Sequence, residues 1–260
     1  KDRWKERTPD WKPGVYERVD DPIRPIYTRL ADHILQIGEQ VPDAQPLLRP
    51  GELVIKDING YRRDANKQPV VDENGRFVLT GEPDGLIDDA DNVLLGSQDP
   101  SWLAGITNTF KYKDFDLNIQ LNGMFGRRMQ DPTEMAYGLG GGDLARYGYN
   151  ALRKIKDRWT WDNPSTTQPT SFNGWGNNYT SGDWYYQRAW FIRLTNISFG
   201  WTLPKAWIAR TKVLSRVRLS LSANNLFCIT PYKGLDPETD YYAASYPNAR
   251  TYSMGINVTF

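Results

Sequence analysis

The sequence predicts an all-β fold whose antiparallel strands cross a membrane as part of a β-barrel. Apolar and polar side chains alternate along segments of about ten residues, the length that a tilted strand needs to span the hydrocarbon core. The connections between these segments are alternately short and long, as in outer-membrane barrels. Aromatic residues make up 13% of the chain, and many lie near the segment ends. The expected strands are residues 102–112, 115–125, 188–202, 213–223 and 251–260.

The composition excludes several other classes of protein. The 260 residues carry a net charge of +1, which lacks the basic excess of a nucleic-acid-binding protein. The single cysteine cannot form an internal disulfide, and the single histidine cannot build a His-rich metal site. No apolar run is long enough for a membrane-spanning helix. The chain begins at Lys1 without a signal-peptide pattern, so we expect a fragment or a processed product.

Residues 1–101 are expected to be an irregular extracellular region that contains an acidic turn. Proline and glycine recur throughout this region, and proline removes a backbone donor from any strand ladder. Two short extended pieces are expected at Ile26–Leu30 and Glu52–Ile58. Residues 61–83 are polar and are expected to form a surface segment with a hairpin around Asn74–Gly75.

Residues 102–125 predict a hairpin with a very short turn at Lys113–Asp114. Apolar side chains occupy the even positions of the first strand and the odd positions of the second, so each strand has one apolar face. These residues are Trp102, Ala104, Ile106, Phe110 and Tyr112, then Phe115, Leu117, Ile119, Leu121 and Phe125.

The next connection, residues 126–186, has no clear period, and the stretch around Asp143–Lys156 is its candidate helix. Strand 188–202 changes parity part-way along its length. A change of parity requires one extra residue, so we expect a β-bulge near Thr195–Asn196. Residues 205–211 are expected to form a short connection with one helical turn.

Strands 213–223 and 251–260 flank a second long loop, residues 225–248. On the strands, the basic residues fall on the polar parity, where they would face the barrel lumen. A basic residue on the lipid face near the midplane would cost about 2–4 kcal/mol, so this placement favours a barrel. These residues are Lys111, Arg193, Arg216 and Arg218.

A soluble β-sandwich, serving as a carbohydrate-binding module, shows the same alternation and is the alternative interpretation. A barrel needs at least about eight strands, so the remaining strands would come from another piece of the same protein. An enzyme of the glycosidase class is a distant third hypothesis. Its acidic candidates are Asp162, Asp183 and Glu238, and no catalytic motif accompanies them.

The motifs of residues 51–260 resemble the SusC/RagA family of TonB-linked outer-membrane transporters. One stretch runs from Asp99-Pro100 through Gly105, Asn108-Thr109-Phe110 and Phe115-Asp116-Leu117 to Gly123. A second runs from Arg193-Leu194-Thr195-Asn196-Ile197 to Leu203-Pro204. The third contains Asn225-Leu226-Phe227, Gly234-Leu235-Asp236-Pro237-Glu238, Tyr246-Pro247-Asn248-Ala249-Arg250 and the closing Gly255-Ile256-Asn257-Val258-Thr259-Phe260.

The resemblance implies that the chain is the C-terminal portion of a 22-stranded antiparallel transmembrane barrel with an N-terminal plug. Such a protein imports oligosaccharides or peptides across the outer membrane of a Bacteroidota bacterium. The TonB complex supplies the energy, a SusD-like surface lipoprotein forms a lid, and neither a cofactor nor nucleic acid is involved. Connections 113–114 and 203–212 would then be periplasmic, and the two long loops would be extracellular.

Two segments resemble the family's acidic loop, Asp57-Ile58-Asn59-Gly60 and Asp84-Gly85 through Asp91, although residues 61–83 interrupt it. Closely spaced carboxylates beside a glycine turn suit a hard cation, so these segments are a candidate site for a structural calcium. The alternative is a solvated acidic turn. The candidate ligands are Asp57, Asn59, Asp84, Asp88 and Asp91.

Aromatic residues of the first long loop are the candidates for substrate binding. Their rings could stack on sugars or grip a peptide, and the alternative is that they pack the loop or contact the lid. These residues are Trp159, Trp161, Trp175, Trp184, Tyr185 and Tyr186.

Overall fold

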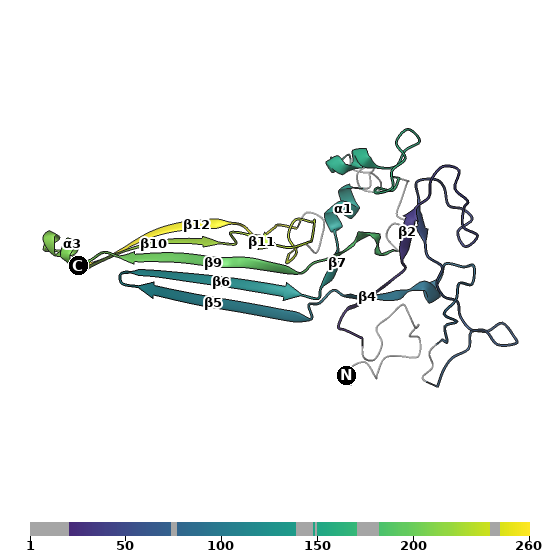
Figure 1. The fold of residues 1–260 in the computed structure, drawn as a ribbon, viewed down its shortest axis with the longest axis horizontal. Coiled ribbons are helices and arrows are strands. Elements are labelled where there is room, and N and C mark those ends of the chain that lie inside the picture. The colour runs from purple at the N-terminus through teal and green to yellow at the C-terminus, as the bar shows by residue number, and fades with distance from the viewer. Residues whose placement is uncertain (1–20, 74–76, 139–147, 149, 171–181, 240–244) are drawn as a thin grey trace. The chain divides into compact units, whose positions relative to one another are not determined.

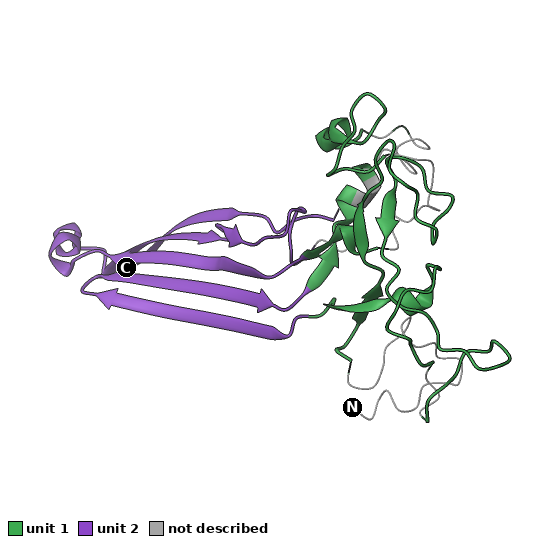
Figure 2. Cartoon of the chain, turned by 45° about the vertical axis from the view of Figure 1, so that its right-hand side comes forward, with its two compact units in different colours: residues 1–99, 128–187, 241–244 green, residues 100–127, 188–240, 245–260 purple. Residues whose placement is uncertain are grey.

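The computed structural model describes residues 21–73, 77–138, 148, 150–170, 182–239 and 245–260 (Figure 1). The chain divides into two compact units, which Figure 2 colours green and purple. The first unit comprises residues 1–99, 128–187 and 241–244, and the second comprises residues 100–127, 188–240 and 245–260. Each unit is therefore assembled from segments that are distant in the sequence.

The first unit consists of short strand pairs and loops around a small core. Strand β1 (Pro25–Thr28) pairs with β4 (Val93–Ser97), β2 (Ala31–Ile34) with β3 (Leu53–Ile55), and β7 (Arg128–Gln130) with β8 (Tyr186–Arg188). Its helical elements are η2 (Asp89–Asp91), α1 (Pro132–Tyr137), η3 (Arg153–Asp157) and η5 (Asp183–Tyr185). The buried core cluster is Ile34, Leu53, Trp159 and Tyr185.

Helix α1 illustrates how local sequence starts an element in this unit. The Asp131 side chain accepts a hydrogen bond from the Glu134 N–H, and Pro132 occupies the first turn. An N-cap acceptor satisfies a backbone donor that has no partner within the helix, and proline has no N–H to lose at that position. The two residues together fix where the helix begins.

The second unit is built on one antiparallel sheet. Its long strands are β5 (Trp102–Tyr112), β6 (Phe115–Phe125), β9 (Phe191–Thr202), β10 (Arg216–Asn224) and β12 (Thr251–Thr259), in the spatial order β12-β10-β9-β6-β5. A two-residue strand, β11 (Cys228–Ile229), also pairs with β9. Helix α3 (Lys205–Ile208) and the 3-10 turn η6 (Ala209–Thr211) connect β9 to β10.

The expected bulge in β9 is present. Gln120 of β6 pairs with Asn196, but the next residue, Leu121, pairs with Leu194, so Thr195 has no partner of its own on β6. The extra residue explains the change of parity, because the apolar face before and after it stays on one side of the sheet.

The turn between β5 and β6 contains only Lys113 and Asp114, and Lys113 has a positive φ of 53°. Two-residue hairpin turns commonly require such a conformation. Strands β5 and β6 occupy the residues expected from the alternation.

Other expected boundaries differ from the structure. The segment 188–202 is not one strand, because β8 ends at Arg188 and β9 begins at Phe191. Strand β10 begins at Arg216 rather than at residue 213, because the helical connection ends with Lys212 in the left-handed conformation. The helix considered at residues 143–156 lies partly outside the described residues, and η3 occupies its end.

The two long irregular regions contain more regular structure than expected. Strands β1 and β3 overlap the two extended pieces, and β2, β4, β7 and α1 were not expected. The tip of the hairpin around Asn74–Gly75 lies outside the described residues, although Val71 and Phe77 on either side form a bridge. In the described part of the chain, no helix has the length and apolar character needed to cross a membrane.

Candidate functional site

The sheet of the second unit has one continuous apolar face. Paired residues on neighbouring strands align the apolar side chains in rows that cross all five long strands. Residues Phe110, Leu221 and Met254 of one row are 57%, 53% and 77% exposed, so nothing in the described chain covers this face. An exposed apolar surface of this extent marks an interface with a membrane or a partner. The row consists of Phe110, Leu117, Phe199, Leu221 and Met254.

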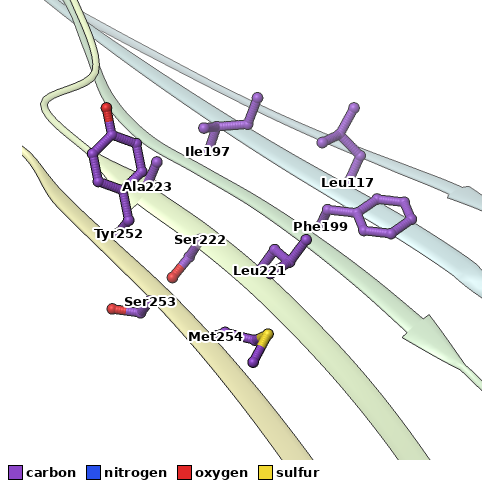
Figure 3. A pocket seen from close by; sticks show the side chains of 9 residues that line it. All are labelled: Leu117, Ile197, Phe199, Leu221, Ser222, Ala223, Tyr252, Ser253 and Met254. Atoms are coloured by element: carbon purple, nitrogen blue, oxygen red, sulfur yellow. The ribbon is translucent and has the colours of Figure 1, made fainter.

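A hollow of about 440 Å³ lies on this apolar face, and Figure 3 shows the side chains that line it. Larger side chains from β6, β9, β10 and β12 surround it. An apolar hollow with few polar groups cannot orient a sugar through hydrogen bonds. The larger apolar residues that line it are Leu117, Ile197, Phe199, Leu221, Tyr252 and Met254.

The opposite face of the sheet is polar. One row contains only small polar residues, and its members are Thr109, Asn118, Ser198, Ser222 and Ser253. The neighbouring polar side chains hydrogen-bond across strands: Asn196 Nδ2 donates to Asn224 Oδ1 at 2.7 Å, and Asn224 Nδ2 donates to Thr251 Oγ1 at 3.0 Å. The two faces therefore have the chemistry of a lipid side and a lumen side.

An ion pair crosses strand β9 on the polar face. Arg218 of β10 donates through Nη1 and Nη2 to the two carboxylate oxygens of Asp116 on β6, at 2.5 and 2.7 Å. Strand β9 lies between them, and Gly200 is the residue that the guanidinium passes over. A Cβ at residue 200 would collide with the guanidinium in this position, so the contact as it stands requires glycine there.

A second ion pair is almost fully buried and anchors the loop after β11. Arg193 of β9 donates through Nη2 to Asp236 Oδ1 at 2.6 Å, and each side chain is only 6% exposed. Asp236 also accepts hydrogen bonds from the backbone N–H groups of Glu238 and Asn248. Three donors thus hold one carboxylate, which offsets the desolvation of a buried charge.

A second buried arginine holds the same loop. Arg127, which directly follows β6 and the glycine after it, is 4% exposed, and its Nη1 donates to the Pro237 carbonyl at 2.9 Å. The segment Asp236–Glu238 is therefore fixed from two different parts of the sheet. The alternation of the sequence places Arg193 on the polar parity, but it does not identify Arg127, Asp236 or Gly200 as structural determinants.

The structure separates the aromatic candidates of the first unit. Trp159 and Tyr185 are each only 2% exposed and belong to the core cluster, and Trp184 packs against that cluster. Tyr186 is half-buried, and burial raises the pKa of its hydroxyl. Trp175 lies outside the described residues.

Among the candidates that the structure describes, Trp161 has the most accessible ring. It is 67% exposed and contacts the buried Trp159 edge to face, with ring centroids 5.4 Å apart. Trp159 is in turn fixed by a hydrogen bond from its Nε1 to Gln36 Oε1 at 3.3 Å. An exposed ring on a rigid support is suited to stacking on a ligand, whereas the two buried rings have a packing role.

The two halves of the acidic loop meet in space although residues 61–83 separate them. Asp91 is fully buried, and its carboxylate accepts hydrogen bonds from the N–H groups of Ile58, Asn59 and Asp88. Asp57 accepts from the N–H groups of Asp84 and Gly85 at 3.2 and 2.7 Å. The carboxylates therefore hold the loop together by themselves.

Of the other three metal candidates, Asn59 Oδ1 accepts from the Gly81 N–H, Asp84 Oδ1 accepts from the Leu86 N–H, and Asp88 Oδ1 accepts from the Ala90 N–H. Within the described residues, no group of three or more His, Cys, Asp or Glu side chains is arranged to hold a metal ion. At least one carboxylate or amide oxygen of each candidate therefore accepts a backbone N–H group. Calcium binding by this loop stays a prediction.

Two of the three acidic residues considered for catalysis have structural partners, and the third, Asp162, is exposed. Asp183 Oδ1 accepts from the Ala31 N–H at 2.8 Å, and Glu238 Oε2 accepts from Asn248 Nδ2 at 3.0 Å. Glu238 also lies 3.4 Å from Arg193 Nε. These contacts give both carboxylates a role in holding loops.

Comparison with known proteins gives consistent relatives, although no family model matches the chain. The chain is 28% identical over 254 residues to TonB-dependent receptor P3 of Formosa agariphila, covering 88% of the chain and 24% of the receptor. It is 27% identical over 213 residues to TonB-dependent receptor SusC of Bacteroides thetaiotaomicron, covering 74% of the chain and 19% of SusC. The chain is of the SusC/RagA type. It spans about a quarter or less of the length of these relatives.

Solved structures support the same fold. The RagAB peptide transporter matches this SusC/RagA-type chain with a TM-score of 0.61 and 22% identity, covering 91% of the chain and 23% of the transporter chain. The closed-closed state of the RagAB peptide importer gives a TM-score of 0.58 at 23% identity, covering 90% of this chain and 23% of the importer chain. The sheet is therefore part of an outer-membrane β-barrel, and the soluble sandwich alternative does not fit.

Proposed function

We propose that this SusC/RagA-type chain forms part of the wall of a TonB-dependent importer that carries oligosaccharides or peptides across the outer membrane. The observation that carries the proposal is the five-strand sheet, in which one face is apolar and exposed and the other is polar and hydrogen-bonded. Such a sheet suits a wall between lipid and an aqueous passage. The similarity to TonB-dependent receptors supports the import function.

The complete importer would work with two partners. A SusD-like surface lipoprotein would cover the extracellular side, and the TonB complex would supply energy through a part of the protein beyond this chain. Turn 113–114 and connection 203–212 would face the periplasm, and the two long loops would be extracellular. The chain would act by binding and gated passage rather than by covalent chemistry, since its relatives are transporters.

The assembly part of the proposal is tested by matched arginine substitutions on strand β12. Ile256 lies on the apolar face and is 63% exposed, whereas Ser253 lies on the polar face. A lipid-facing arginine near the midplane costs about 2–4 kcal/mol, so Ile256→Arg should abolish accumulation of the complete protein in the outer membrane. Ser253→Arg should accumulate normally. Equal accumulation of both variants would contradict the assignment of the faces.

The transport part requires a separate experiment. Cells that lack the gene are complemented with the complete protein and are offered labelled oligosaccharides or labelled peptides. We expect uptake of one class to depend on the gene and to stop when a protonophore removes the energy supply. If the protein assembles in the outer membrane and uptake of neither class depends on it, import of these nutrients is excluded. The assignment of the sheet as part of a membrane barrel would not be affected.

A further inference from the structure

Two short connections lie at the same end of the membrane sheet. The Lys113–Asp114 turn joins β5 to β6, and residues 203–215 join β9 to β10 through α3 and η6. The register places them together, because Phe115 at the start of β6 pairs with Trp201 near the end of β9. Figure 1 shows α3 beside this end of the sheet. The surface of interest therefore consists of this turn and this connection.

The surface is basic and its charges are not neutralised. It carries Lys113, Lys205, Arg210 and Lys212, whereas its single acidic residue is Asp114. All four basic side chains are exposed, and none forms an ion pair within the part of the chain that the structure describes. Lys113 Nζ lies over the ring of Tyr112, 5.3 Å from its centroid. These four cations are available to an external anion.

The surface also carries an exposed tryptophan that is continuous with the lipid-facing side of the sheet. Trp207 is 57% exposed and contacts Trp201 edge to face, with ring centroids 6.0 Å apart. Trp201 stacks on Phe115 at 5.7 Å, and Phe115 belongs to the apolar face. The neighbouring Ile208 is only 5% exposed, so α3 buries one apolar side chain beside its exposed tryptophan.

We propose that this surface binds the headgroups of anionic glycerophospholipids in the leaflet at this end of the barrel. Trp207 would lie at the boundary between headgroups and acyl chains, where its amphipathic ring is favoured. Lys205, Arg210 and Lys212 would contact the phosphates, with their alkyl stems along the apolar surface. Continuity with the lipid-facing sheet favours a lipid over a soluble partner. The proposal requires the sheet to span a membrane and is independent of the nutrient imported.

The test uses the complete transporter purified in detergent, incubated with phosphatidylglycerol or phosphatidylcholine and weighed by native mass spectrometry. We expect the wild type to retain phosphatidylglycerol in preference to phosphatidylcholine. The triple variant Lys205→Gln, Arg210→Gln, Lys212→Gln should reduce that preference by roughly tenfold, because each basic residue near an anionic surface contributes to lipid attraction. Trp207→Ala should weaken retention of both lipids.

A control variant removes the same number of charges elsewhere. Arg62, Lys67 and Lys156 are exposed residues of the first unit, and changing all three to Gln should leave the lipid preference unchanged. The proposal is overturned if the first triple variant keeps the wild-type preference. If that variant keeps the preference and also loses a co-purifying protein, the surface would be assigned to protein docking instead.

A measurement on the wild type covers the case in which the triple variant fails to assemble. Salt screens interactions between exposed charges, so the preference for phosphatidylglycerol should fall as salt rises to about 0.5 M. A preference that is independent of salt would exclude binding by these exposed cations.

Discussion

Gly200 lies beneath the guanidinium of Arg218, which crosses strand β9 to reach Asp116. The pair links two strands that are not neighbours, and it does so on the polar face. A side chain at residue 200 would occupy the space through which the guanidinium passes. A residue without a Cβ thus permits a contact that spans three strands.

We predict that Gly200→Ala weakens the barrel. The added Cβ meets Arg218 and Asp116, so the ion pair must separate, and the folded band should lose its heat-modifiable mobility at a lower temperature. The matched control is Gly105→Ala on β5, where an added Cβ would have only an ordinary contact of 3.6 Å with Asn122. Equal effects of the two substitutions would show that the loss arises from removing a strand glycine and not from the ion pair.

We predict a larger effect when the buried pair of Arg193 and Asp236 is broken. Replacing Asp236 with Asn removes the buried charge partner of Arg193, and breaking a buried pair destabilises proteins by about 3–5 kcal/mol. The loop around residues 236–238 should then be cut faster by added protease in the intact protein. Glu238→Gln should have a small effect, because Glu238 is 43% exposed and lies 3.4 Å from Arg193. A protected loop in the Asp236→Asn variant would contradict an anchoring role for this pair.

We predict that Gly51→Ala disrupts the core of the first unit. Gly51 has a φ of +93°, and an added Cβ would lie 2.5 Å from Trp159 Cε3. The substitution therefore combines backbone strain with a steric clash against a buried ring. Gly81→Ala is the control, because φ there is +78° but nothing lies within 4 Å. Limited proteolysis of the two variants should give rapid cleavage for Gly51→Ala only. If both variants are cleaved equally fast, backbone strain at a positive φ explains the effect and the clash with Trp159 does not.

We predict that the first unit becomes less stable as the pH rises above neutral. Burial by itself lowers the pKa of His33, but hydrogen bonds with Asp32 and Glu39 outweigh it, and the net pKa is raised. The His33 ring nitrogens lie 3.0 Å from Asp32 Oδ2 and 2.6 Å from Glu39 Oε1. A group whose pKa is raised in the folded state stabilises it fully below the unfolded pKa, and this contribution is lost as the pH rises through the folded pKa.

The thermal midpoint of the intact protein at pH 6 and at pH 8.5 tests this pH dependence. His33→Gln should remove the part of the difference that His33 contributes, since glutamine does not titrate. The effect should be small, because the side chains involved are about 40% exposed and water screens their charges. An identical pH dependence in the variant would exclude His33 as the source.

The hairpin of β5 and β6 shows what the sequence alone could predict. Strand alternation and a two-residue turn are local properties, and the two strands occupy the expected residues. The bulge at Thr195 was also predictable, because an inserted residue changes the parity of the sequence. Strand β7, in contrast, has three residues, which is too short to establish a period.

The partners of the buried charges could not be predicted. Arg193 and Asp236 are 43 positions apart, and nothing in the alternation of β9 indicates which loop residue reaches it. The sequence also could not show that Trp159 is buried and Trp161 is exposed. The two residues are of the same type and lie only two positions apart. Only the chain fold distinguishes a packing ring from an accessible one.

The bulge at Thr195 makes strand β9 unusually tolerant of a change in length at one position. Deleting a residue elsewhere in a long strand would turn every side chain beyond it to the opposite face. Without Thr195, Asn196 and Leu194 would become neighbours opposite Gln120 and Leu121, with all side chains still on their present faces. The deletion would remove the hydrogen bond that the Asn225 N–H donates to the Thr195 carbonyl at 3.0 Å. Length variation in this strand is therefore expected to concentrate at Thr195, and a one-residue deletion scan would reveal it as the permissive site.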